Sequence, residues 1–207
     1  MSQIFRTSLF CISFLVLLIF SSCGMKSEGE KSDADKVGIE NNLIKADSGD
    51  YEMRLPKEMY KLADLNDDAS FQYADSSEEL YVIVIHESKA DFIKSFSDER
   101  LKENRYNDSI SPEMNYRIVQ LKSIQENMEM EKDPAISKMK INGLDAEIVD
   151  YTGTPENMTI PIFYKVGFVE GKKYIYMIMT WTIKEYTSTN NEKMDFMIRS
   201  FKLTDKK

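Results

Sequence analysis

The segment KYIYMIMTWTI, residues 173–183, decides the fold. Successive side chains of a strand point to opposite faces of its sheet. One face of this segment would carry Ile175, Met177, Met179, Trp181 and Ile183, and the other would carry Tyr174, Tyr176 and Ile178. Because both faces are apolar, the segment predicts an interior strand that other elements cover on both sides.

A second strand with two apolar faces is predicted over LYVIVIHES, residues 80–88. Its alternating sets are Tyr81, Ile83 and Ile85 against Val82, Val84 and His86. Shorter runs bounded by turn residues predict further strands and hairpins. These are YEMRLP (51–56), stopped by Pro56; a hairpin of YKLADL (60–65) and ASFQYA (69–74); residues 135–142 and LDAEIVDYTG (144–153), joined at Gly143; and residues 160–171, turning at Glu170-Gly171-Lys172.

Three helices are expected between and after these strands. The first covers 89–104, with Phe92, Phe96 and Leu101 facing inward. The second begins at Ser111-Pro112-Glu113, because Ser caps helices, Pro suits the first helical position and Glu favours the positive helix end. Its expected inward stripe is Met114, Ile118, Leu121, Ile124 and Gln125. The third opens at the capping box Thr189-x-x-Glu192. It carries Met194, Met197, Ile198 and Phe201.

The order of elements is strands, two helices, strands and a final helix. Consecutive strands joined by tight turns predict an antiparallel sheet, and interior strands with two apolar faces require cover on both sides. The sequence therefore predicts an α+β domain in which helices cover both faces of an antiparallel sheet, an α/β/α sandwich.

Three stretches carry a resemblance to a known fold family. YEMRLPKEM (51–59), INGLDAEIVDYTG (141–153) and KMDFMIRSFKL (193–203) are similar to the opening strand, centre and closing helix of the PsbP-like fold. The photosystem PsbP subunit, the Ran-binding Mog protein and the DcrB lipoproteins share that fold. The resemblance covers roughly residues 51–203 and implies an accessory or binding role in an envelope or assembly complex, with no shared catalytic residues.

The N-terminus has the layout of a secretory signal. Arg6 supplies the basic end, residues 9–20 are almost all apolar, and Ser21 and Ser22 are small residues before Cys23. The apolar run is shorter than the about 20 residues that a bilayer-spanning helix needs. Residues 1–22 are therefore expected to be a cleaved signal peptide.

Cys23 is the predicted lipidation site. Phe20-Ser21-Ser22-Cys23 resembles the lipobox of bacterial lipoproteins, in which the cysteine becomes acylated after cleavage. Phe20 stands where most lipoboxes carry Leu, as is tolerated in Bacteroidota-type lipoproteins, which the sequence resembles. Cys11 lies within the signal, so Cys23 would have no disulfide partner. The alternative is an ordinary signal peptide with an incidental cysteine.

Residues 23–50 predict an acidic, flexible tether, because their composition cannot bury enough apolar surface to order the chain. As a random coil the segment would span about 30 Å. Gly24 follows the cysteine, where Asp often retains lipoproteins at the inner membrane, so an outer-membrane location is expected, facing the periplasm or the surface. The acids after Cys23 are read either as a solvated linker or as a surface-export signal.

The rest, residues 51–207, predicts a single domain with a substantial core. The net charge is −8, and it becomes −9 once the signal and its Arg6 are removed. This acidity argues against nucleic acid as a partner, because phosphates require a basic surface. The expected partners are membrane lipid, through acylated Cys23, and an envelope protein of unknown identity.

No catalytic, cofactor-binding or metal-binding residues are predicted. His86 has neither a G-x-S-x-G serine nor a second thiol to serve, which favours a structural histidine. Residues 64–75 partly match a calcium loop, but Ala69 and Asp75 stand where Gly and Glu are required, which favours a polar turn.

The acidic run ENMEMEKD, residues 126–133, has methionines between its acids. It is interpreted as a solvated helix end or, since methionine adapts to binding surfaces, as a partner site. The function expected overall is non-enzymatic binding by a lipid-anchored envelope protein. The alternatives are an anchored hydrolase, which two carboxylates converging in a pocket would favour, and a carrier of an apolar ligand.

Overall fold

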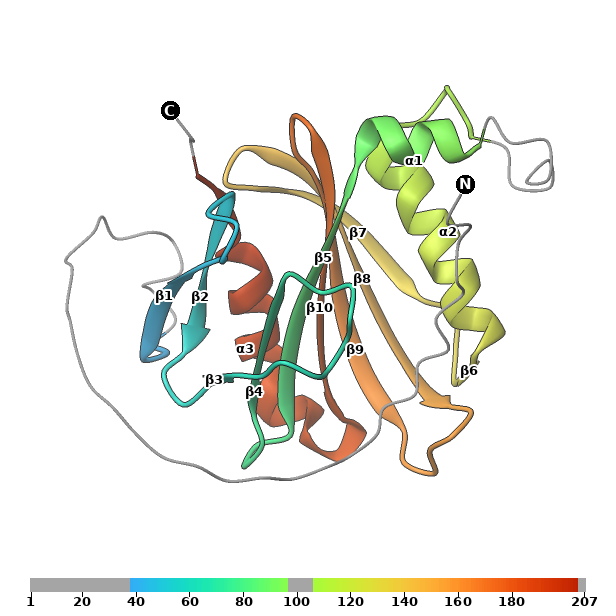
Figure 1. Cartoon of the computed structure of the whole chain (residues 1–207). Helices are drawn as coiled ribbons and strands as arrows, with labels where there is room; N and C mark the ends of the chain where they lie inside the picture. The colour runs from blue at the N-terminus through green and yellow to red at the C-terminus, as the bar shows by residue number, and fades with distance from the viewer. Residues whose placement is uncertain (1–37, 97–105, 205–207) are drawn as a thin grey trace.

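The computed structural model describes residues 38–96 and 106–204 (Figure 1). The strands are β1 (Asn41–Lys45), β2 (Tyr51–Pro56), β3 (Tyr60–Lys61), β4 (Phe71–Asp75), β5 (Leu80–Ser88), β6 (Met128–Met130), β7 (Ala135–Ile141), β8 (Leu144–Pro155), β9 (Ile162–Glu170), β10 (Tyr174–Ile183) and β11 (Lys202–Leu203). The helices are α1 (Lys89–Ser95), α2 (Pro112–Glu126), a 3-10 turn η3 (Lys184–Tyr186) and α3 (Thr187–Arg199).

The strands form two antiparallel sheets. The large sheet has the order β3-β4-β5-β10-β9-β8-β6, with β7 also paired to β8, and the small sheet has the order β1-β2-β11. Strand β10 pairs with β5 on one side and β9 on the other. The two-faced character predicted for residues 80–88 and 173–183 is confirmed, because their alternating residues enter two separate hydrophobic clusters.

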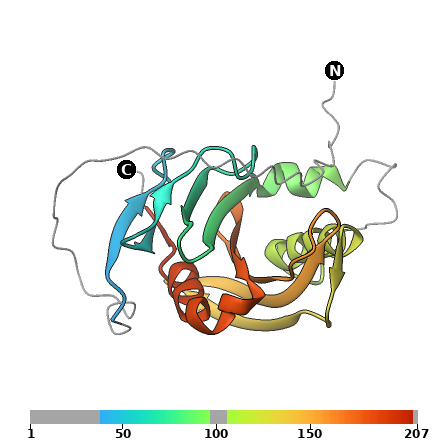
Figure 2. The same ribbon diagram turned by 90° about the horizontal axis from the view of Figure 1, so that it is seen from below.

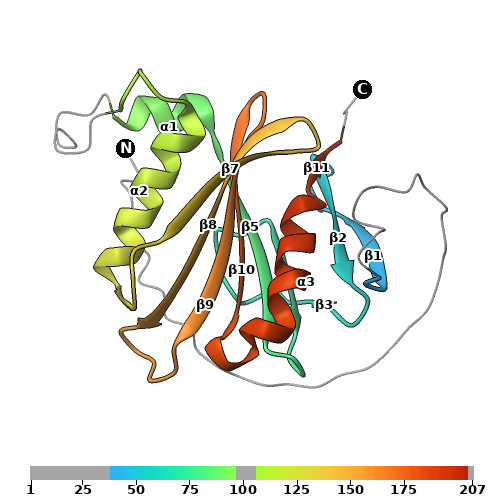
Figure 3. The same ribbon diagram turned by 180° about the vertical axis from the view of Figure 1, so that it is seen from behind.

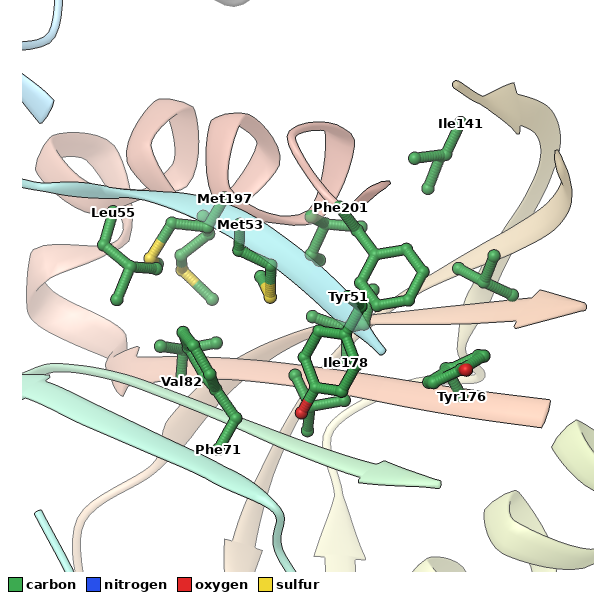
Figure 4. Close-up of a cluster of buried hydrophobic side chains, with 14 of the residues drawn as sticks. Tyr51, Met53, Leu55, Phe71, Val82, Ile141, Tyr176, Ile178, Met197 and Phe201 are labelled. Atoms are coloured by element: carbon green, nitrogen blue, oxygen red, sulfur yellow. The ribbon is translucent and has the colours of Figure 1, made fainter. Parts of the chain in front are cut away.

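Helix α3 and strand β2 cover one face of the large sheet. Buried side chains in this α3 cluster include Tyr51, Met53, Leu55, Phe71, Val82, Ile141, Tyr176, Ile178, Met197 and Phe201 (Figure 4). The ring of Tyr51 lies 6.0 Å from that of Phe71, 5.6 Å from Tyr176 and 5.3 Å from Phe201, measured between centroids. This single ring therefore joins the small sheet, the large sheet and the end of α3.

Helices α1 and α2 cover the opposite face. In this α2 cluster the buried ring of Tyr116 lies 5.2 Å from Phe92 of α1 and 6.1 Å from Phe168 of β9. On the same face of the sheet, four aromatic residues that pair across neighbouring strands form a row of rings. Their centroid distances are 5.2 Å for Tyr81–Trp181, 6.5 Å for Trp181–Tyr164 and 4.9 Å for Tyr164–Tyr151. Such cross-strand aromatic pairs fix the register of a sheet.

The predicted fold class is confirmed. The large antiparallel sheet has α1 and α2 on one side and α3 on the other, together with the small sheet (Figure 3). The hairpin turn predicted at Gly143 is also confirmed, since Asn142 and Gly143 adopt φ of 48° and 84° between the paired residues Ile141 and Leu144. Two positive φ angles are what a two-residue turn of this type requires.

The predicted tether extended too far along the chain. Residues 41–45, within the predicted segment 23–50, form β1, which pairs with β2 from Asn41↔Pro56 to Lys45↔Glu52. The polar composition was misleading because β1 gains its hydrogen bonds from β2 and needs few buried side chains of its own. Ile44 packs against the α3 cluster, and that contact helps to hold the strand. Residues 23–37 lie outside the described ranges, so the tether remains a prediction there.

The predicted inward face of α2 was right only in part. Leu121 is buried and Ile124 packs against the α2 cluster, as predicted. Ile118, however, is 49% exposed, and Glu113, Asn115 and Tyr116 are buried instead. Two of these residues are polar, and a hydrophobic pattern assigns polar residues to solvent. Asn115 is buried because its side chain donates to the carbonyls of Asn107 and Ser111 and accepts from the amide of Asn107. The next residue, Tyr116, lies in the α2 cluster.

The boundaries of the other two helices also differ from expectation. Helix α1 ends at Ser95, and the remainder of the predicted 89–104 helix, including Leu101, lies largely outside the described ranges. Helix α3 begins at Thr187, directly after η3, so Thr189 lies inside the helix and cannot cap it. Buried Asn190 instead holds this end, donating to the Glu78 carbonyl and the Thr182 hydroxyl. The expected inward residues of α3 are buried, as predicted.

Gly167 sets how closely α3 approaches the sheet. A Cβ atom on Gly167 would lie 2.7 Å from Cγ2 of Ile198 and 3.5 Å from Cδ1 of Ile148. We expect Gly167→Ala to lower the free energy of unfolding by about 1–3 kcal/mol through overpacking, measured by urea denaturation. Ile198→Ala removes the clashing methyl group, so the loss in the double variant should be smaller than the sum of the two single losses. Additive losses would show that this contact does not set the helix position.

Candidate functional site

Helix α2 begins at the end of the sheet where β8 starts and β9 finishes (Figure 1). The residues at this place line a polar pocket. Its volume is about 260 Å³. It is lined by Ser111, Glu113, Met114, Lys138, Met139, Asp145, Ala146, Glu147 and Glu170. The pocket therefore draws its wall from the start of one helix and from three strands that follow it along the chain.

The start of α2 places Glu113 at this pocket. Pro112 occupies the first helical turn, and Asn115 ties that turn to the preceding loop at Asn107. Tyr116 then anchors the same turn in the α2 cluster. With Asn115 and Tyr116 fixed, the side chain of Glu113 is directed against the end of β9.

Two carboxyl groups meet in the pocket. Glu113 is only 5% exposed, and its side chain lies within hydrogen-bonding range of that of Glu170. Glu170 is also held by Lys89 at the start of α1, with 2.8 Å between Nζ and Oε1. Two adjacent carboxylates repel one another, so the pair retains a proton that is shared between them.

The environment moves the two pKa values apart. Burial raises the pKa of Glu113 to about 7, the hydrogen bond with Glu170 adds to this effect, and the neighbouring Ser111 side chain acts against it. Burial also acts to raise the pKa of Glu170, but the hydrogen bond from Glu113 and the Lys89 ammonium outweigh it and lower that pKa. The shared proton therefore belongs mainly to Glu113, while Glu170 is the ionised member.

Every other acid of the pocket wall has a basic partner. Glu147 pairs with Arg117, with 2.5 Å between Oε2 and Nε, and lies 3.8 Å from the Lys138 ammonium. Asp145 accepts from Lys140 at 2.7 Å. Among the residues that the structure describes, Glu113 is the one acid of the pocket wall without an ion-pair partner.

Two buried polar atoms at the pocket, the Ser111 hydroxyl oxygen and Oε2 of Glu113, make no hydrogen bond of standard length and angle to any described residue. The Ser111 side chain does lie near enough to Glu113 to act against the rise in the pKa of that carboxyl. Ser111 precedes the helix, but its side chain makes no capping bond. Buried polar atoms nearly always have a partner. The pocket therefore offers hydrogen-bond acceptors on Ser111 and Glu113, together with a proton on the Glu113 carboxyl that can dissociate.

The residues singled out from the sequence lie away from this pocket. Cys23 is outside the described ranges, so its lipidation stays a prediction. His86 lies near the end of β5 on the face of the α3 cluster, where its Nδ1 lies 3.0 Å from the Ser70 hydroxyl. That hydroxyl is also 2.8 Å from the hydroxyl of Tyr51. His86 is thus linked to a core tyrosine by a hydrogen-bonded chain.

The segment considered as a calcium loop connects β3 to β4 and continues into β4. Its polar groups bond within the segment: Asn66 accepts from the amide of Asp68, and Gln72 accepts from the amides of Leu65 and Asn66. At its end, Asp75 accepts from the amide and hydroxyl of Ser77. These contacts have the form of polar turns.

The acidic, methionine-bearing run covers the last residue of α2, all of β6 and the loop that follows. A second hollow, of about 410 Å³, borders it. Its lining residues are Gln125, Glu126, Met128, Glu129, Thr154, Pro155, Glu156 and Met158. This hollow does not decide whether the run is a solvated helix end or a partner site. The use of the run as a partner site therefore stays a prediction. In the described part of the chain, no helix combines the length and apolarity needed to span a membrane.

The sequence missed Glu113 and Glu170 as a pair. Glu113 was interpreted only as a helix-start residue, and Glu170 only as a turn residue. The Ser-Pro-Glu helix start could have drawn attention to Glu113, but no local pattern indicates which strand end that helix would face.

Comparisons with protein-family models and with curated sequences found no match. Among solved structures, the fold is similar to cyanobacterial PsbP (CyanoP) from Synechocystis sp. PCC 6803, with 13% identity, a TM-score of 0.49 and coverage of 85% of this chain and 98% of that one. It is also similar to LpqN, involved in cell envelope biogenesis of Mycobacterium tuberculosis. That match has 9% identity and a TM-score of 0.44, and it covers 86% of this chain and 99% of that one.

A protein of Bacteroides thetaiotaomicron VPI-5482 is similar as well, with 12% identity and a TM-score of 0.47. Here the match covers 79% of this chain but 48% of the other. Similarity of this degree carries no inference about activity or partners. The antiparallel α+β architecture is instead established by the strand pairing and layers of the chain itself.

Replacing Glu113 with Gln should change how stability depends on pH. The raised pKa means that the neutral carboxyl contributes its full stability below about pH 4.5, and that this contribution is lost as pH rises through about 7. Gln stays neutral, so Glu113→Gln should gain about 1–3 kcal/mol over the native chain between pH 5 and pH 8, measured by urea denaturation at both values.

The matched control is Glu126→Gln, an exposed acid on the same helix. It should shift stability equally at the two pH values. The lowered pKa of Glu170 affects stability in a different pH range. Its stabilising contribution is lost only as pH falls below the usual pKa range of a glutamate. An unchanged pH profile in Glu113→Gln would show that Glu113 is ionised throughout.

Proposed function

We propose that this chain is a lipid-anchored protein of the bacterial cell envelope whose folded domain binds a partner without catalysing a reaction. The anchor rests on the sequence: a basic residue, a short apolar run and small residues lead directly to Cys23. Two or more acyl chains on one residue are enough for stable attachment, whereas one chain is marginal. The outer membrane is the location that Gly24 favours.

The observation that carries the binding role is the pair of unfilled acceptors at the pocket. The Ser111 hydroxyl and Oε2 of Glu113 are buried, make no hydrogen bond of standard geometry to a described residue, and border an open hollow. A buried acceptor without a partner costs about 1–3 kcal/mol. A ligand that supplies donors at this position would recover that free energy on binding.

The position of β1 is compatible with binding while the chain is anchored. The strand lies on the side of the domain away from α2, whose first turn forms the pocket (Figure 2). β1 is the first element of the described part of the chain, and Cys23 precedes it in the sequence. An anchor at Cys23 would therefore leave the pocket accessible from the opposite side.

A hydrolase is the second candidate, because two carboxyls do converge in the pocket. Glycosidase pairs stand about 5–9.5 Å apart so that a sugar or a water can enter between them. Here the two carboxyls contact each other, and Lys89 neutralises the ionised member. Turnover of a glycan or peptide that Glu170→Gln abolishes would favour the hydrolase over the binding role.

The third alternative, a carrier of an apolar ligand, needs an apolar cavity between sheet and helices. In the described residues, packed side chains of the α3 and α2 clusters occupy these positions. The pocket at Glu113 is instead lined mostly by charged and polar residues. The geometry therefore favours a polar ligand.

Changing Cys23 to Ala should abolish both processing and anchoring. The variant should keep its signal peptide and lose labelling by a palmitate analogue, because the acylated sulfur is absent. After carbonate washing of the envelope fraction it should be released, whereas the native chain stays. Ser22→Ala keeps a small residue before the cysteine and is the control. Normal processing and retention of Cys23→Ala would overturn the anchor.

A further inference from the structure

We propose that the pocket at the start of α2 binds a primary ammonium group, as carried by a lysine side chain, through Glu113, Ser111 and Glu170. This inference rests on the proposed binding role and adds the chemical class of the ligand. It is argued from the charges, the acceptor atoms and the size of the pocket.

The charges of the wall leave one position for a cation. Glu170 pairs with Lys89, Glu147 with Arg117, and Asp145 with Lys140. Lys138, the remaining cation of the wall, has a side chain that is 70% exposed and lies 3.8 Å from Glu147. If Glu113 ionises, its buried carboxylate has no cation within ion-pair distance among the described residues. A buried charge requires a partner, and an incoming cation would provide it.

The acceptor atoms match an ammonium group. An ammonium has three N–H donors and no acceptor. The pocket presents Oε2 of Glu113 and the Ser111 hydroxyl oxygen, neither of which makes a hydrogen bond of standard geometry to a described residue, and the carboxylate of Glu170 next to them. Three donors would thus meet acceptors on three residues.

A guanidinium fits this arrangement less well. Its planar fork suits a carboxylate that offers both oxygens to it. In the pocket, Glu113 and Glu170 lie within hydrogen-bonding range of each other, and Lys89 holds Oε1 of Glu170. A compact charge that binds single oxygens from several groups is therefore favoured over arginine.

The volume limits the ligand to a small group. The pocket of about 260 Å³ is below the roughly 300–1,000 Å³ that is typical for sites of drug-sized ligands. Met114 and Met139 in the wall offer apolar surface for the methylene stem of a lysine. Methionine adapts its shape to such contacts. One side chain of a partner, or a small free amine, is the size that fits.

Binding should exchange a cation for a proton. The ammonium requires ionised Glu113, so the proton that this carboxyl holds must leave as the cation enters. The charged and titratable side chains around Glu113 are Lys89, Tyr106, Arg117, Lys138, Asp145, Glu147 and Glu170. The shift of the Glu113 pKa to about 7 indicates that this exchange occurs near neutral pH.

The test is calorimetric titration of the full chain in detergent with Nα-acetyl-L-lysine amide at pH 6 and pH 8. Affinity should rise about tenfold between these values, because the ionised fraction of a group with a pKa of about 7 rises by that factor. At pH 6, buffers of different ionisation enthalpy should report release of nearly one proton for each amine bound. The Nε-acetylated analogue carries no charge and should not bind.

Two variants and one control separate this site from other acids on the surface. Glu113→Gln should weaken binding at pH 8 at least tenfold and remove its pH dependence. Ser111→Ala should weaken binding by a smaller factor, roughly threefold, since one acceptor is lost. Glu126→Gln, on the same helix but outside the pocket, should bind as the native chain does.

A second titration distinguishes the two possible sources of the ammonium group, a lysine side chain of a partner protein and a small free amine. A short peptide with one central lysine should bind more tightly than the single amino acid derivative if the ligand is a protein side chain. Equal affinities would assign the pocket to a free amine. Tighter binding of an arginine peptide would contradict the choice of ammonium.

Several outcomes would overturn the proposal. These are no heat with any amine at pH 8, binding that Glu113→Gln leaves intact, and binding of Ca²⁺ in place of the amine. A folded Glu113→Gln chain with the native pH profile of binding would do so as well. Each result is independent of the anchor, because Cys23→Ala is judged by cell fractionation. Failure at the pocket and failure of the anchor would therefore be distinguishable.

Discussion

Burial of β10 on both faces is the constraint on which the rest of the structure depends. A strand whose two faces are apolar needs cover on each side, and the chain supplies α2 on one side and α3 on the other. Gly167 on the neighbouring strand lets Ile198 of α3 come close to the sheet. Tyr51 then attaches the small sheet to the same layer. The layers therefore follow from the side-chain pattern of one strand.

The same constraint creates the pocket. Tyr116 must reach the core beneath α2, and it lies three residues after Glu113. Residues three apart share one side of a helix, so burying the tyrosine also turns Glu113 toward the sheet. At that height the sheet presents the end of β9, where Glu170 stands. The carboxyl pair is thus a consequence of packing a tyrosine, and Lys89 and the shared proton make it tolerable.

Sequence reasoning succeeded where side chains of one kind alternate. The faces of residues 80–88 and 173–183 and the inward residues of α3 follow from apolar periodicity, because burial of apolar area dominates those elements. It failed where polar groups are buried by specific hydrogen bonds. Asn115 is buried by its hydrogen bonds in the first turn of α2, and β1 is held by its pairing with β2. The contact between Glu113 and Glu170 depends on tertiary placement and has no signature in the spacing of the chain.

The position of an unpaired polar atom decides whether it can serve binding. Tyr151 is also buried without a partner for its hydroxyl among the described residues, and burial raises its pKa far above the usual value. Its ring, however, is stacked on Tyr164 within the aromatic row, and Tyr151 lines neither of the two hollows, so its unpaired hydroxyl only reduces stability. Ser111 and Glu113 border a hollow that opens to the outside. The same energetic penalty is therefore recoverable at the pocket and permanent in the core, and this difference gives the start of α2 its functional interpretation.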